Sequence, residues 1–244
     1  MAPALKRAPE KLLIASAGRR IPVVIRRNAR ARRLILRVDE SLGLPVLTLP
    51  ARTSLIQGEQ FLRKNISWLE DRLGQLAPAA PFADGSVFPL RGTPCRIRGR
   101  RGRGIITLAR RESGFLLTVP GEPEFMVRRI TEWLRREARR DLERAVARHC
   151  KAIGREPKGL RVSDPKSRWG SCSVAGVLTF SWRLVLAPPR VLDYLAAHEA
   201  AHLKEMHHGA KFWALVGRLD PDFESARDWL NKGGVALSAV GRAA

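Results

Sequence analysis

The segment HEAAHLKEMHHGAKFW, from His198 to Trp213, limits what this chain can fold into more than any other stretch. Residues four apart lie on one face of an α-helix, so His198 and His202 can direct two ring nitrogens at one metal ion. Glu199 lies beside them. In the HExxH arrangement this carboxylate does not bind the metal but accepts a proton from water that the metal activates. The segment therefore predicts a helix that carries a metal-dependent hydrolytic site.

A catalytic zinc usually takes three protein ligands and keeps one position open, so a third ligand is needed. His208 lies six residues after His202, and on an unbroken helix a rotation of about 600° would point it away. The chain must therefore break near residues 205–207 and turn back. The turn has to form without glycine, because Gly209 comes after the histidines. We rank the candidates for the third ligand in the order His208, Glu224, and then His207 and Glu205.

The first half of the chain is predicted to be β-rich. Three short apolar runs predict a three-stranded meander, at residues 21–27, 32–38 and 44–50. Ser54 and Gln57 predict a capping box at the start of one helix that covers this meander. The stretch 74–85 is rich in Pro, Ala and Gly and predicts a linker, and the runs between 86 and 120 predict two hairpins.

The second half is predicted to contain more helix. Apolar residues at helical spacing predict a long helix from Pro123 to His149, which stops before Gly154. Pro188 and Pro189 stand where the histidine-bearing helix can begin, since proline is tolerated in the first turn. The other predicted elements are strands at 159–163 and 177–185 and helices at 211–219 and 222–230.

The net charge of the chain indicates its binding partners, and its cysteines indicate the cellular compartment. The 45 lysines and arginines against 23 acidic residues give a formal net charge of +22, which favours polyanionic partners such as nucleic acid or nucleotides. The RGRRGRG run at 98–104 has no aromatic residue among its arginines, so sequence-specific base recognition is not predicted. Cys95, Cys150 and Cys172 are an odd number at wide spacing, which predicts a reducing compartment. Since no apolar run could span a bilayer, we expect a cytoplasmic protein without membrane partners.

Several motifs resemble those of the YgjP-like metallopeptidases, which are related to the SprT-like zinc proteases. The resemblance covers nearly the whole chain and is strongest in the motifs RWGSCS (168–173), FSWRLVLAPP, LDYLAAHEAAHLKEMHHGAKFW and LDPDFESARDWL. It implies an α+β, minigluzincin-like zincin domain in which His198, His202 and His208 bind zinc and Glu199 is catalytic. The family usually has Asn where this chain has Ser181 and His207, and the Ala-Ala spacer inside HEAAH is also a departure.

With this resemblance, we expect a β-rich N-terminal region over 1–120, a zincin-like metallopeptidase domain over 121–232 and a loose tail over 233–244. The leading functional hypothesis is a zinc metallopeptidase acting on peptides or proteins, with the strand after RWGSCS as an edge for an extended substrate. One alternative is a metal-dependent nucleoside triphosphate (pyro)phosphohydrolase. Another is a nucleic-acid-associated protein with a structural zinc, which would bind DNA through its basic surface.

Overall fold

The computed structural model describes residues 10–16, 19–39, 42–165 and 168–242. They form two compact units, of which the first ends at Ala77 and the second begins at Pro78. This boundary lies inside the predicted linker but differs from the predicted division at 120. The reason is that the strands between 87 and 120 share a hydrophobic core with the long helix that follows them.

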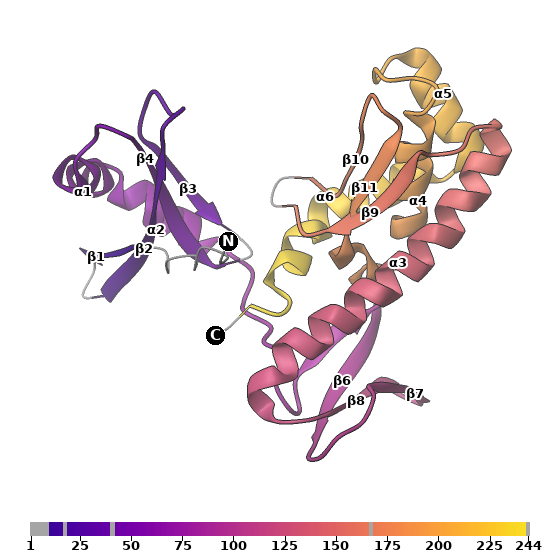
Figure 1. The fold of residues 1–244 in the computed structure, drawn as a ribbon, viewed down its shortest axis with the longest axis horizontal. Coiled ribbons are helices and arrows are strands. Elements are labelled where there is room, and N and C mark those ends of the chain that lie inside the picture. Colours follow the sequence, from indigo (N-terminus) through magenta and orange to yellow (C-terminus); the bar gives the residue numbers. More distant parts are fainter. Residues whose placement is uncertain (1–9, 17–18, 40–41, 166–167, 243–244) are drawn as a thin grey trace, which may run out of the picture. The chain divides into compact units, whose positions relative to one another are not determined.

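The first unit is a four-stranded sheet with two helices (Figure 1). Its elements are β1 (Lys11–Ser16), β2 (Arg19–Asn28), β3 (Ile35–Asp39), β4 (Leu44–Pro50), α1 (Leu55–Lys64) and α2 (Ile66–Gly74). The strand order is β1-β2-β4-β3, with β2 and β4 parallel and the outer pairs antiparallel. The predicted meander is therefore wrong. The apolar strand β4, with Val46, Leu47 and Leu49 fully buried, takes a central place, and the more exposed β3 lies at the edge.

The capping box at the start of α1 is confirmed. The Ser54 hydroxyl accepts a hydrogen bond from the backbone N–H of Gln57, and the Gln57 side chain accepts one from the backbone N–H of Ser54 at 2.9 Å. The single predicted helix is in fact two, because the side chain of Asn65 donates to the carbonyl of Phe61 at 2.8 Å and interrupts it. The apolar face continues across the break, since both Leu62 and Leu69 are fully buried.

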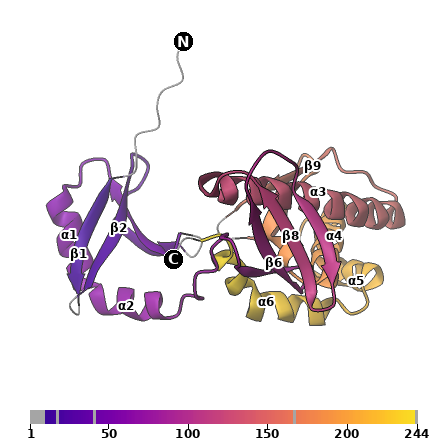
Figure 2. The same cartoon turned by 90° about the horizontal axis from the view of Figure 1, so that it is seen from below.

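The second unit opens with another four-stranded sheet, and its two predicted hairpins are confirmed. The strands are β5 (Val87–Leu90), β6 (Thr93–Arg100), β7 (Thr107–Arg111) and β8 (Gly114–Pro120). Their order is β5-β6-β8-β7, and Figure 2 shows the parallel pair β6 and β8 side by side. Gly114 makes the close approach possible, because a Cβ there would lie 2.2 Å from the carbonyl oxygen of Pro94.

The long helix α3 (Met126–Ile153) confirms the helix predicted after residue 123. A short 3-10 turn, η1 (Pro123–Phe125), leads into it, and Gly154 ends it in the left-handed conformation with φ 63°. Figure 1 shows α3 running from the sheet β5–β8 along the elements that follow in the chain. Among the described residues, no helix combines the length and the apolar composition that a membrane crossing requires.

A small mixed sheet, one 3-10 helix and three α-helices complete the second unit. They are β9 (Gly159–Ser163), β10 (Gly170–Cys172), β11 (Val177–Ser181), the 3-10 helix η2 (Trp182–Leu186), α4 (Pro189–Ala201), α5 (Ala210–Leu219) and α6 (Phe223–Ala239). In the order β10-β11-β9, β11 takes the central place, so the strand after RWGSCS is not the edge that was predicted. Among the described residues, β10, which lies within that motif, pairs only with β11 and forms an edge of the sheet. The strand predicted over 177–185 ends at Ser181, because the next five residues, all buried, turn into η2.

Residues 233–242, predicted to be part of a loose tail, are ordered by packing, and residues 243 and 244 lie outside the described part. Helix α6 continues to Ala239, and Gly234 packs closely on the indole of Trp169. The guanidinium of the buried Arg183 donates to the carbonyls of Leu237 at 3.0 Å and Val240 at 2.7 Å. These hydrogen bonds satisfy carbonyls at the end of α6, a need that the sequence of the tail itself does not reveal.

Candidate metal centre

Helix α4 places the HEAAH motif in the core of the second unit. It begins at Pro189, as predicted, and Val191 and Leu195 are buried on its apolar side. Ala196, Ala200 and Ala201 have no exposed surface. Small side chains at these positions let α4 pack closely against its neighbours, which gives the Ala-Ala spacer of the motif a structural reason.

The chain breaks at His202 and brings a third histidine back to the first two. Helix α4 ends at Ala201, and the turn that follows contains no described residue with positive φ, so it needs no glycine. The Nδ1 atom of His202 lies 3.0 Å from the carbonyl oxygen of Glu205. A hydrogen bond from Nδ1–H to that carbonyl leaves Nε2 of His202 free as a metal ligand.

The three imidazoles of His198, His202 and His208 converge. Their candidate ligand atoms all lie within 4.8 Å of one another, and the Nε2 atoms of His198 and His208 are 3.1 Å apart. The fully buried ring of Phe212 contacts all three, with ring centroids 4.5 to 4.9 Å from theirs. The indole of Trp213 stacks on His208. These aromatic contacts hold the three rings in fixed positions.

The chemistry of this donor set fits a divalent metal ion. Burial, together with the nearby His202 and His208, lowers the pKa of His198 to about 4. A neutral imidazole is the form that binds a metal, so this environment favours the ligand form well below neutral pH. Three nitrogen ligands with free space beside them match a catalytic zinc site better than a closed structural one.

Glu199 lies beside the cluster in an apolar setting. The residue is 4% exposed, and burial raises the pKa of its carboxyl group to about 7, although the charge of Arg168 acts in the opposite direction. Its Oε2 atom has no hydrogen-bond partner among the described residues. A buried carboxyl group with an unused oxygen and a pKa near neutrality is suited to receive and return a proton.

Gly170 on β10 faces this carboxyl group directly. A Cβ at that position would lie 2.5 Å from Oε1 and 2.9 Å from Cγ of Glu199. Contacts this short cannot be accommodated without moving Glu199. The absence of a side chain at Gly170 therefore permits the observed position of the carboxyl group. The sequence pattern did not identify this role, although a glycine following Trp169 was a visible signal.

A cavity of about 290 Å³ joins these groups. It is lined by Gly170, Ser171 and Cys172 of β10, by the three clustered histidines and Glu199, and by Met206. Burial and the neighbouring charge of Glu199 raise the pKa of the Cys172 thiol. The thiolate is thereby disfavoured, which argues against Cys172 as a nucleophile.

The other residues considered as the third metal ligand lie outside the histidine cluster. His207 is exposed and Glu205 contributes its carbonyl oxygen, and neither side chain belongs to the histidine cluster. The Glu224 side chain is 74% exposed and lies 3.9 Å from the guanidinium of Arg227. His149, the remaining histidine of the chain, is buried, and its Nε2 lies 2.9 Å from a carboxylate oxygen of Asp193 on α4. Tyr194 packs against Phe223, consistent with a structural role.

Comparisons with known proteins identify the family of this chain. The family model described as "YgjP-like, metallopeptidase domain" matches residues 32–233, which is most of the chain. Among solved structures, the crystal structure of the metallopeptidase zymogen abylysin from Pyrococcus abyssi is 21% identical, with a TM-score of 0.35. That match covers 38% of this chain and 95% of the other. A search of the curated proteins found no match.

Proposed function

Because this chain belongs to the YgjP-like metallopeptidase family, we propose that it is a zinc-dependent peptidase in which Glu199 activates water for attack on a peptide bond. The observation that carries the proposal is the convergence of three imidazoles, with ligand atoms within 4.8 Å of one another, beside a buried carboxyl oxygen that has no hydrogen-bond partner among the described residues. An α+β fold with a small sheet beside the HExxH helix is the setting that a zincin-like site requires.

His198, His202 and His208 would hold the metal. A zinc ion bound there supplies Lewis acidity, which polarises a substrate carbonyl and lowers the pKa of water. Glu199 accepts the proton of the attacking water and then delivers it to the nitrogen of the leaving amine. His202 keeps its ring orientation through the contact of Nδ1 with the carbonyl of Glu205.

Strand β10 is suited to hold the substrate. It forms an edge of its sheet and lines the cavity that contains Glu199. An extended peptide can add to such an edge through main-chain hydrogen bonds, which places its carbonyl groups along the cavity. Peptides and proteins are therefore the proposed substrates, and Ser171 lies where it would contact them.

The deciding experiment is metal analysis of the purified protein combined with a mass-spectrometric screen for peptide hydrolysis. Glu199→Gln should retain zinc and lose about 10²- to 10⁴-fold in turnover, the range for removal of a general base. Glu224→Gln is the matched control, because this exposed carboxylate lies outside the cluster, and it should leave both properties unchanged. Wild-type protein without stoichiometric metal, or undiminished hydrolysis by Glu199→Gln, would exclude the proposal.

Hydrolysis of nucleoside triphosphates at the same site is a second candidate function. It is favoured by the formal net charge of +22 and by Arg168, whose charge acts on Glu199. Adding nucleotides to the product screen separates the two activities, because phosphate or pyrophosphate would be released in place of peptide fragments. A purely structural zinc is less well supported, since the fourth histidine, His207, does not join the cluster.

A further inference from the structure

A dense group of arginines lies on the sheet β5–β8. The sequence from Gly85 to Arg111 contains no aspartate or glutamate. We use the name arginine surface for seven exposed residues of this stretch: Arg96, Arg98, Arg100, Arg101, Arg103, Arg110 and Arg111. None of the basic residues in it is lysine.

The strand pattern explains why these side chains point outward. Along β6, Cys95 and Ile97 are buried, whereas Arg96, Arg98 and Arg100 are exposed. Alternate residues of a strand point to opposite faces, so one face of β6 supplies the core and the other supplies arginines about 6.6 Å apart. The connection to β7 continues the same composition.

Part of the arginine surface is hollow. A cavity of about 840 Å³ is lined by Arg96, Arg98, Arg110 and Arg111, together with two residues of the turn between β7 and β8 and two residues of β8. Glu112 is the acidic residue among them. The guanidinium of Arg110 lies 5.9 Å from the ring centroid of Phe115. A concave site of this kind can surround a chain of anionic groups on more than one side.

The guanidiniums of the arginine surface have no carboxylate partner among the described residues. Two of them donate to backbone carbonyls, Arg96 to Gly85 at 3.1 Å and Arg100 to Arg103 at 3.4 Å. Their positive charge therefore remains available to a partner.

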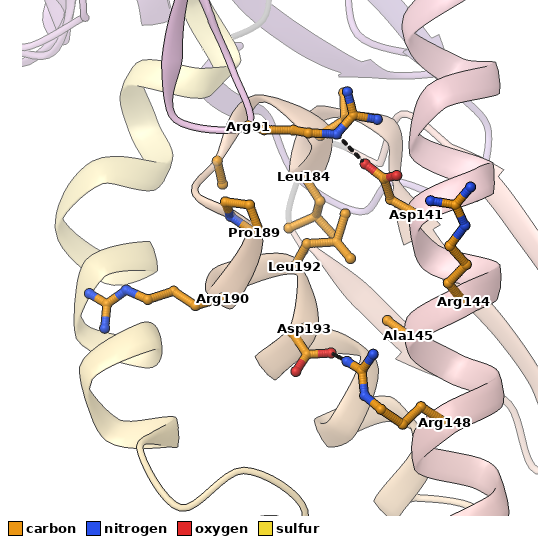
Figure 3. A pocket seen from close by; sticks show the side chains of 12 residues that line it. Arg91, Asp141, Arg144, Ala145, Arg148, Leu184, Pro189, Arg190, Leu192 and Asp193 are labelled. Atoms are coloured by element: carbon orange, nitrogen blue, oxygen red, sulfur yellow. Dashed lines mark hydrogen bonds and ion pairs between the residues drawn. The ribbon is translucent and has the colours of Figure 1, made fainter.

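A second cavity rich in arginine shows the contrast. In the pocket between α3 and α4, Arg91 pairs with Asp141 and Arg148 pairs with Asp193, as the dashed lines of Figure 3 show. Arg190 at its edge lies 3.3 Å from Asp222. Three of the four arginines there are committed to internal ion pairs, and only Arg144 has no such partner among the described residues.

We propose that the arginine surface binds nucleic acid through its phosphate backbone and without sequence preference. A guanidinium offers two parallel N–H donors to a phosphate, a geometry that lysine does not provide. Residues 96–111 include no aromatic side chain, and the guanidinium of Arg110 lies over the ring of Phe115 in the cavity. The contacts are therefore to phosphates and not to bases. Membrane-surface segments carry an apolar face beside their basic residues, whereas here Ile105 is the single large exposed apolar residue between 96 and 111.

The arginine surface lies away from the metal centre. Figure 1 shows the sheet β5–β8 at one end of α3, and β10 and α5 toward the other end. Helix α3 has 28 residues, a length of about 42 Å. Nucleic-acid binding at this surface therefore does not depend on the proposed hydrolytic function, and Glu199→Gln protein should bind as the wild type does.

Binding can be measured by fluorescence anisotropy with the full chain and a labelled DNA duplex of arbitrary sequence. If the four cavity arginines contact phosphates, affinity should fall about 100-fold between 50 and 200 mM salt. The variant Arg96→Gln, Arg98→Gln, Arg110→Gln and Arg111→Gln should weaken binding and reduce the salt slope by about 4. A second duplex of unrelated sequence should bind equally well.

The matched control removes the same charge elsewhere. Four exposed arginines of α3 are replaced, by Arg135→Gln, Arg136→Gln, Arg139→Gln and Arg144→Gln. This control should keep most of the affinity, and thermal melting by circular dichroism should show that both variants fold. An equal loss in the control, no binding by the wild type, or binding that follows base sequence would overturn the proposal. So would a cavity variant that loses binding to phosphatidylserine vesicles but keeps its affinity for DNA.

Discussion

The two four-stranded sheets of this protein have the same strand order but different roles. In each, two antiparallel hairpins are joined by a parallel central pair, β2 with β4 in the first sheet and β6 with β8 in the second. The connection between the hairpins is rich in arginine in both cases. The first sheet is followed by two short helices, α1 and α2, whereas the second is followed by the 28-residue α3.

The two sheets differ in role because the helices that follow them differ in length. The first sheet has a small core of its own, which includes Ile14, Leu47 and Leu62. The core of the second sheet extends along α3 and includes residues of η2, α4 and α5. A sheet of this topology can therefore have a core of its own, or it can share the core of a larger unit when a long helix connects it to other elements.

The largest expected effect on stability comes from creating a cavity in each of the two hydrophobic cores in turn. Leu47 lies on β4 and Leu117 on β8, each a strand of a central parallel pair. Replacing either residue by Ala removes a fully buried side chain and should lower the free energy of unfolding by about 2–5 kcal/mol. Leu117→Ala should release zinc at a lower urea concentration, because its core also supports α4. Leu47→Ala should leave zinc release unchanged. Equal sensitivity of zinc release to both substitutions would contradict the separation into two cores.

A second prediction concerns pH and is confined to the catalytic unit. In metal-free protein the pKa of Glu199 is raised to about 7 from 4.5, so between these values the folded state binds more protons than the unfolded state. Stability is then lost as pH rises, and the loss should amount to roughly 3 kcal/mol by pH 8. Relative to wild type, Glu199→Gln should gain most of this amount, about 2.5 kcal/mol, between pH 5 and 8 in urea titrations with a chelator. A constant difference across that range would show that burial does not perturb this carboxyl group.

The third prediction tests how β10 positions Glu199, the proposed catalytic group. Gly170→Ala should displace Glu199 and lower kcat by about 100-fold, with zinc content unchanged, because a misplacement near 1 Å has an effect of that size. Gly159→Ala is the matched control on β9, where an added Cβ meets no atom within 4 Å. It should retain full activity. If Gly170→Ala protein turned over substrate normally, the glycine would have no positioning role.

The smallest expected effect lies in the first unit. Ser54→Ala removes the capping hydrogen bond of α1 and should destabilise this unit by about 1 kcal/mol. Trp68, the tryptophan of the first unit, provides a fluorescence signal for its unfolding. Peptide hydrolysis by the variant should equal that of the wild type. Reduced hydrolysis would indicate that the first unit contributes to catalysis.

Local patterns were sufficient to predict many of the elements. The capping box at Ser54, the long helix closed by Gly154 and the helix that begins at Pro189 each depend on residues close in sequence. The spacing of His198 and His202 places both imidazoles on one helical face for the same reason. Such features are local, so the sequence alone reveals them.

Long-range contacts decided the rest. The order of β2, β4 and β3 depends on which strand buries the most apolar surface, and the ordering of the C-terminal segment depends on Arg183, which lies far from it in sequence. The sequence by itself determined which residues could form a metal-binding and proton-transferring group. Only the tertiary structure decided that His208 returns to His198 and that Gly170 abuts Glu199. A helical period fixes neighbours one turn apart, whereas contacts across a chain break or between elements depend on how the whole core packs.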